Sequence, residues 1–157
     1  MGKKRKRDRQ ASMWVATADL PKSAGHPFYA RLNRVLDDAG FDTFVEAQGA
    51  PFYADGIGRP SLAPGRYFRL LLLGYFAGLD SERAIAWRAT DALSIRQFLD
   101  FALHEAPPDH SPLSRTRRLI DLETHRAVFT WILQVLATAD LVKGKTNARL
   151  CIVMPHS

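Results

Sequence analysis

Residues 64–79 read PGRYFRLLLLGYFAGL, the most hydrophobic segment of the chain. Proline is favoured at the first position of a helix, so Pro64 marks a helix start. The apolar side chains that follow cover nearly the whole circumference of that helix; they are Tyr67, Phe68, Leu70, Leu71, Leu72, Leu73, Tyr75 and Phe76. Because a helix that is apolar all round is a buried one, the segment predicts a central helix that other helices surround. Residues 67–79 include Arg69 and are too few for a membrane span of about 20 apolar residues.

Upstream of this segment, the sequence has two further helical patterns. Residues 28–39 place apolar side chains at the spacing of one helix stripe, which Gly40 ends. A shorter helix is expected over residues 42–48, before Pro51 ends it. Residues 53–60 have the composition of a turn-rich loop.

Downstream, two serines and a pair of prolines predict where the next helices begin and end. Ser81 and Ser94 are of the residue type that caps a helix, and each precedes a run with the helical period. Residues 104–110 contain paired prolines, which forbid a helix, so this segment is expected to be a loop.

Ser111 caps the next expected helix, which has Pro112 at its first position and runs to about residue 120. A last helix begins at residue 121 or 122, and one of its faces carries Leu122, His125, Phe129, Ile132, Leu133 and Leu136. Residues 149–154 are the only strand-like run, with no obvious strand to pair with. The expected fold is therefore all-α: a multi-helix, helix-turn-helix-like bundle with a disordered basic N-terminal arm and an irregular C-terminal tail.

The positive charge of the chain is concentrated at its N-terminus. The 157 residues carry a formal net charge of +6. The first nine residues hold one acidic side chain, Asp8, and six basic ones: Lys3, Lys4, Arg5, Lys6, Arg7 and Arg9. The rest of the chain is thus nearly neutral, and the arm is attracted to polyanions, either nucleic acid or an anionic membrane surface. The alternative is a disordered tail that only improves solubility.

The sequence also argues against several classes of protein and site. A single cysteine, Cys151, permits neither an internal disulfide nor a zinc site built on thiolates, so we expect an intracellular, bacterial-like protein. The short apolar run after the basic arm is closed by Asp19 and is no signal peptide. The cluster of His104, Glu105, Asp109 and His110 matches no metal-ligand spacing, and His125 is expected to be a packed histidine. We therefore expect no metal site and no catalytic residue.

Residues 111–120 are the best candidate for a binding site. Leu113, Thr116 and Ile120 share the face expected to point inward. Arginine can fork onto phosphate or guanine, and hydroxyl groups add phosphate contacts. The expected DNA contacts of this helix are Ser111, Ser114, Arg115, Arg117 and Arg118, with Arg117 on the DNA backbone, and the six basic residues of the arm join them. The alternatives are a solvated face of an ordinary amphipathic helix, or a recognition helix at residues 94–101.

Four blocks of sequence occur in the order and at the spacing of a known family. They are Gly58-Arg59-Pro60-Ser61, RLLLLGYFAGL at residues 69–79, Ser81-Glu82-Arg83, and PDHSPLSR at residues 108–115. Over residues 26–146 the chain resembles the N-terminal domain of insertion-sequence transposases of the InsH-like DDE type. The resemblance implies an all-helical region that binds the terminal inverted repeats of a mobile element. It also implies a following ribonuclease-H-like domain, whose Asp-Asp-Glu carboxylates hold two divalent metal ions for strand transfer.

The resemblance stops at residue 146, and no acidic residue follows Asp140. We therefore expect a truncated or frameshifted copy without its own strand-transfer activity. The expected divisions are a basic arm and linker (residues 1–25), a DNA-binding domain (26–142) and an aberrant tail (143–157).

The expected partner is double-stranded DNA at the element ends, in the nucleoid of the cytoplasm and without membrane contact. No cofactor is expected in this chain, whereas an intact transposase of this type would use a divalent metal such as Mg²⁺. An alternative function is a helical interaction module, which forms a homodimer or a heterodimer with an intact transposase and inhibits it. A further alternative is a remnant that folds poorly.

Overall fold

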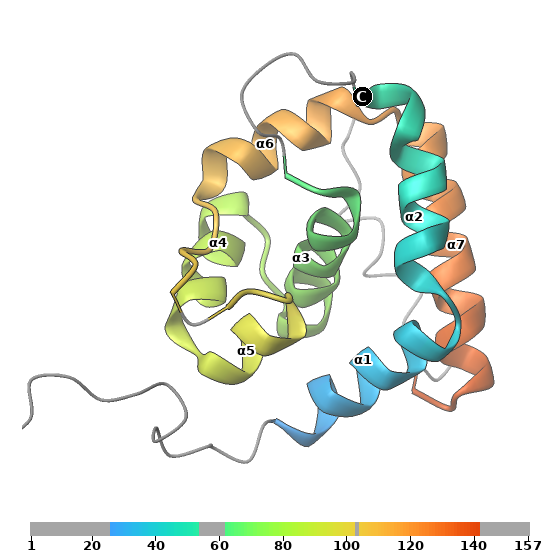
Figure 1. The fold of residues 1–157 in the computed structure, drawn as a ribbon, viewed down its shortest axis with the longest axis horizontal. Coiled ribbons are helices and arrows are strands. Elements are labelled where there is room, and N and C mark those ends of the chain that lie inside the picture. Colours follow the sequence, from blue (N-terminus) through green and yellow to red (C-terminus); the bar gives the residue numbers. More distant parts are fainter. Residues whose placement is uncertain (1–25, 54–61, 103, 142–157) are drawn as a thin grey trace, which may run out of the picture.

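The computed structural model describes residues 26–53, 62–102 and 104–141, and the regular structure within them is entirely helical (Figure 1). The elements are α1 (Pro27–Asp38), α2 (Phe41–Gly49), the short 3₁₀ helix η2 (Ala50–Phe52), α3 (Pro64–Ala77), α4 (Glu82–Asp91), α5 (Leu93–Phe98), α6 (His110–Leu119) and α7 (Leu122–Thr138). The predicted all-α fold is confirmed. The expected arm, the expected tail and most of the expected loop at residues 53–60 lie outside the described residues. None of the described helices is long and apolar enough to cross a bilayer.

Helix α3 is the centre of the bundle. Every residue from Tyr67 to Tyr75 is buried, as the all-round apolar pattern predicts. Figure 1 shows α3 enclosed by the other helices, with α4 and α5 on one side and α2 and α7 on the other. Packing contacts join α7 to α1, α1 to α5, α5 to α4 and α4 to α6, and only two residues separate α6 from α7. These five helices therefore form a ring around α3, with α2 packed directly on its side.

Local sequence sets the end of α3 and the start of α4. Gly78 has a φ of 65°, in the left-handed region that glycine adopts without strain, and ends α3. The N–H of the next residue, Leu79, then donates back to the carbonyl of Gly74 at 2.8 Å. The Oγ atom of Ser81 accepts a hydrogen bond from the N–H of Ala84 at 3.2 Å, which confirms the predicted cap.

The start of α6 differs from the prediction. The N-cap is Asp109 rather than Ser111: the Oδ1 atom of Asp109 accepts a hydrogen bond from the N–H of Ser111 at 2.7 Å, and His110 is already helical. A carboxylate suits the positive end of a helix, so Asp109 is the better cap. Pro112 consequently lies third in the helix, where it is tolerated because the first four N–H groups have no partner within the helix.

Helices α2 and α5 each begin before the predicted position. Ser94, predicted as a cap, is the second residue of α5, and the actual N-cap, Ala92, makes no side-chain capping bond. Helix α5 packs against α1 and α4. Helix α2 starts at Phe41, whose buried ring adds one residue to the expected helix.

Gly74 permits a close approach of α3 and α4, and its replacement is a test of that packing. A β-carbon at this position would lie 2.6 Å from the Cδ1 atom of Ile85, which is itself buried. We expect Gly74→Ala to lower the free energy of unfolding by about 1–3 kcal/mol, although alanine is the better helix former, because overpacking forces the neighbours to shift. Urea denaturation measures the loss.

Ile85→Val provides the matched control, because valine lacks the Cδ1 atom. The double variant Gly74→Ala/Ile85→Val should be more stable than the sum of the two single losses predicts. Strictly additive losses would contradict the close contact as the cause.

Candidate nucleic-acid interface

Helix α6 has one buried face and one exposed face. Leu113, Thr116 and Ile120 are at most 3% exposed, which confirms the predicted inward face. Arg115 and Arg118 are exposed to solvent. The helix thus presents two guanidinium groups, three positions apart, while its other side is fixed in the core.

The two predicted serine contacts lie near these arginines. Ser111 is exposed and Ser114 is half-buried. The carbonyl oxygen of Ser111 accepts a hydrogen bond from Nε of Arg115 at 3.4 Å, so this side chain lies back toward the first turn of α6. The six basic residues expected to join them, in the arm, lie outside the described part of the chain.

Arg117 is placed differently from the other two arginines. Its Nη1 atom lies 3.2 Å from Oε1 of Glu82, at the first residue of α4. Residue 117 follows Leu113 by four positions, so it sits at the edge of the buried face rather than on the exposed one. The predicted contact of Arg117 with the DNA backbone is therefore in competition with an ion pair inside the bundle.

A buried histidine connects α7 to α3. The Nδ1 atom of His125 lies 2.7 Å from the carbonyl oxygen of Asp121, and its Nε2 atom lies 2.8 Å from the hydroxyl of Tyr67. Since a carbonyl only accepts, Nδ1 carries the proton, and the Tyr67 hydroxyl donates to Nε2 of the neutral ring. Burial lowers the pKa of His125, against the opposing effect of the Asp121 carbonyl, and burial likewise raises the pKa of Tyr67. His125 is thus the packed histidine that the sequence predicts.

The depressed pKa of His125 makes the stability of the fold depend on pH. The folded state binds the proton less readily than the unfolded chain, in which the pKa is near its ordinary value of 6.5. The contribution of His125 is therefore complete above pH 6.5 and is lost progressively as the pH falls below that value. We expect the urea midpoint to fall between about pH 7 and pH 5.

His125→Gln serves as the control for this prediction, because its amide has no titration in the range. The pH dependence in the same interval should flatten, even if the variant is less stable overall. A wild-type midpoint that stays constant over the interval would show that His125 titrates normally.

The two acidic residues of the predicted cluster in the α5–α6 connection have structural partners. Glu105 accepts two hydrogen bonds from Arg66, at 2.6 and 3.1 Å, and these bonds lower the pKa of Glu105. Asp109 caps α6. Within the described residues, no group of three or more His, Cys, Asp or Glu side chains is placed to hold a metal ion.

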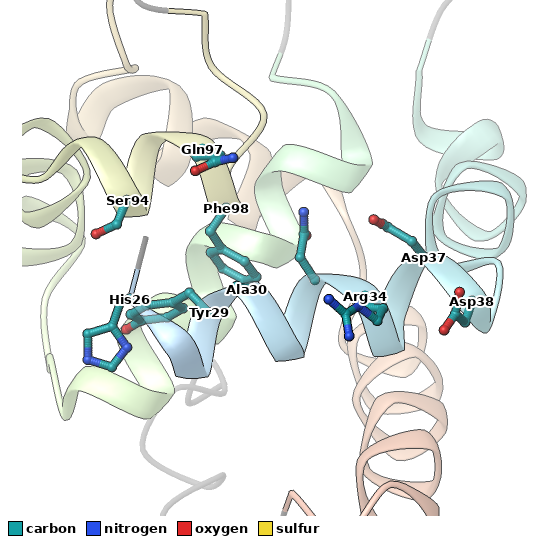
Figure 2. A pocket seen from close by; sticks show the side chains of 10 residues that line it. His26, Tyr29, Ala30, Arg34, Asp37, Asp38, Ser94, Gln97 and Phe98 are labelled. Carbon is teal, nitrogen blue, oxygen red and sulfur yellow. The ribbon is translucent and has the colours of Figure 1, made fainter. Parts of the chain in front are cut away.

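A cavity of about 380 Å³ lies between α1 and α5 (Figure 2). Sequence reasoning did not identify it, because its walls come from segments about 60 residues apart; they are His26, Tyr29, Ala30, Asn33, Arg34, Asp37, Asp38, Ser94, Gln97 and Phe98. In Figure 2 the ring of Tyr29 lies beside Phe98, while Arg34, Asp37 and Asp38 lie further along α1. This mixture of one cation and two carboxylates does not favour a phosphate group, so the cavity is no part of the candidate interface.

Comparison with protein families identifies the class to which the chain belongs. Residues 16–119 match a family described as "Transposase domain (DUF772)". The match covers more than half of the chain, which therefore belongs to this family of transposase domains. It ends at the last residue of α6 and so includes the exposed arginines. No curated protein and no solved structure matches the chain.

Proposed function

We propose that this transposase domain binds double-stranded DNA at the terminal inverted repeats of a mobile element, with α6 as the helix that reads the bases. The observation that carries the proposal is the exposed pair of Arg115 and Arg118 on a helix whose opposite face is buried. Membership of a transposase-domain family supports it, since that class of protein acts on mobile DNA.

The dimensions of α6 suit the major groove of DNA. Its ten residues have a length of about 15 Å, and an α-helix with its side chains is about 10–12 Å across. The major groove is about 12 Å wide and admits one α-helix. Arginine there bonds to O6 and N7 of guanine, and a serine hydroxyl bonds to phosphate.

Helix α4 packs against α6, as the first helix of a helix-turn-helix packs against its recognition helix. Helix α5 and an irregular segment lie between α4 and α6 in sequence. The pair therefore resembles a helix-turn-helix in how its helices pack, but not in how they are connected. Both neighbours of the recognition helix, α4 and α7, are anchored on the core by buried apolar residues.

The charges of the chain suggest separate sources of affinity and specificity. Two exposed arginines on α6 are too few for strong attraction to the phosphate backbone, but are enough to distinguish bases. The six basic residues at positions 3–9 supply the sequence-independent attraction in our proposal. Strand cleavage and transfer are not part of the role proposed for this helical region.

Replacing both exposed arginines tests whether α6 is the helix that reads the bases. We expect Arg115→Ala/Arg118→Ala to weaken binding to the cognate repeat by about 2–5 kcal/mol, and binding to a scrambled duplex by much less. Fluorescence anisotropy with the two duplexes, at one salt concentration, measures both affinities.

Arg34→Ala/Arg126→Ala is the matched control, since it removes the same charge from exposed positions on α1 and α7. It should lower both affinities slightly and equally. If the α6 variant behaves like this control, the recognition helix lies elsewhere, for example at residues 94–101. The mass of the complex in sedimentation also reports whether a second chain joins it.

Deleting residues 2–9 tests the basic arm. The truncated chain should lose affinity for all duplexes by a similar factor and keep its preference for the cognate repeat. The slope of log Kd against log salt concentration should decrease by about one unit for each lost phosphate contact. An unchanged slope would remove the arm from the interface.

A further inference from the structure

The Glu82–Arg117 ion pair is more enclosed than an ordinary surface pair. Its side chains are 20% and 24% exposed, whereas those of the Arg88–Asp91 pair on α4 are 47% and 58% exposed. The Nε atom of Arg117 is buried and has no hydrogen-bond partner among the described residues. The guanidinium thus lies partly inside the bundle, where the Glu82 carboxylate is its charged partner.

The guanidinium of Arg117 also lies near the buried polar groups of two other helices. Its charge counteracts the rise that burial causes in the pKa of Tyr67 on α3. It adds to the effect of burial in lowering the pKa of His125 on α7. One side chain of α6 therefore acts on groups from α3, α4 and α7.

We infer that Arg117 is a positioning residue and not a DNA contact: its ion pair with Glu82 fixes the rotation of α6, so that Arg115 and Arg118 face outward. This inference rests on the proposed function and assigns a role within the same interface. It divides the three arginines of α6 into one internal anchor and two external contacts.

Helix geometry explains why such an anchor is needed. Successive residues of a helix differ by about 100° around its axis. A roll that released Arg117 to solvent would therefore carry Arg115, at the opposite edge of the exposed face, toward the bundle. Leu113 sets the depth of α6 through apolar contacts, which are non-directional, and the buried Thr116 side chain hydrogen-bonds with Tyr53. The ion pair of Arg117 with Glu82 and its hydrogen bond with the Tyr67 hydroxyl are directional contacts that fix the angle as well.

Neutralising Glu82 gives opposite results under the two possible roles of this carboxylate. If Glu82 only adds negative charge near DNA, Glu82→Gln should tighten binding to every duplex. If it anchors Arg117, Glu82→Gln should weaken binding to the cognate repeat by about tenfold and reduce the preference over a scrambled duplex by a similar factor. The full chain is titrated with both duplexes at several salt concentrations.

Asp91→Asn is the matched control, because it removes a carboxylate from the same helix where the partner, Arg88, is exposed. It should leave the preference for the cognate repeat unchanged. Arg117→Met, which keeps an unbranched apolar stem and removes the guanidinium, should reproduce the effect of Glu82→Gln without changing the salt slope. Combining the two changes should weaken binding no further than either change alone.

Two binding results would overturn the inference. One is tighter binding by Glu82→Gln, as expected of a purely repulsive charge. The other is a salt slope lowered by about one unit in Arg117→Met, which would identify a phosphate contact. Hydrogen exchange of the free protein separates this inference from the proposed function: loss of the anchor should speed exchange of residues 110–119 relative to α2 whether or not DNA binds. Unchanged exchange in Glu82→Gln would also contradict the anchor.

Discussion

The buried guanidinium of Arg69 on α3 determines how the first three helices are arranged. It is 4% exposed, and it bonds to Asn33 and Asp37 on α1 and to both carboxylate oxygens of Asp42 on α2. Its Cζ atom lies 4.7 Å from the centre of the Phe41 ring. A buried charge without partners is strongly unfavourable, so α1 and α2 must meet the same side of α3. Helix α1 is the member of this group that also belongs to the ring of helices around α3.

The central helix could be predicted from residues 64–79 alone, because a segment that is apolar on all sides needs a covering whatever its neighbours are. Arg69 lies in the same segment, yet the sequence indicates nothing of its role, since its partners lie 27 to 36 residues upstream. Arg117 is similar: periodicity separates the buried and exposed faces of α6, but its partner Glu82 is 35 residues away. Periodicity and capping predict local structure, whereas pairing between distant charges is decided by the tertiary fold.

Arginine also holds the irregular segment that leads from α5 into α6. Arg66 on α3 forms its two-pronged contact with Glu105 and also donates to the carbonyl oxygen of Asp100 at 2.8 Å. Arg96 on α5 donates to the carbonyl oxygen of Ala102 at 2.9 Å. The approach to the proposed reading helix is thus tied to the core by side chains from two helices. Arg66, Arg69 and Arg96 thus hold parts of the bundle together, whereas Arg115 and Arg118 are exposed on α6.

The ring around α3 has a mechanical consequence. On α1, the Nη2 atom of Arg31 donates to the carbonyl oxygen of Ala139 at 3.0 Å, which fastens the end of α7 to the first helix. A displacement of α6 can therefore reach α1 in two ways: along the backbone through α7, and through the packing contacts of α4 and α5. With 17 residues, α7 is about 25 Å long. A displacement of α6 is therefore shared by the helices on both sides of it and does not stay confined to α6.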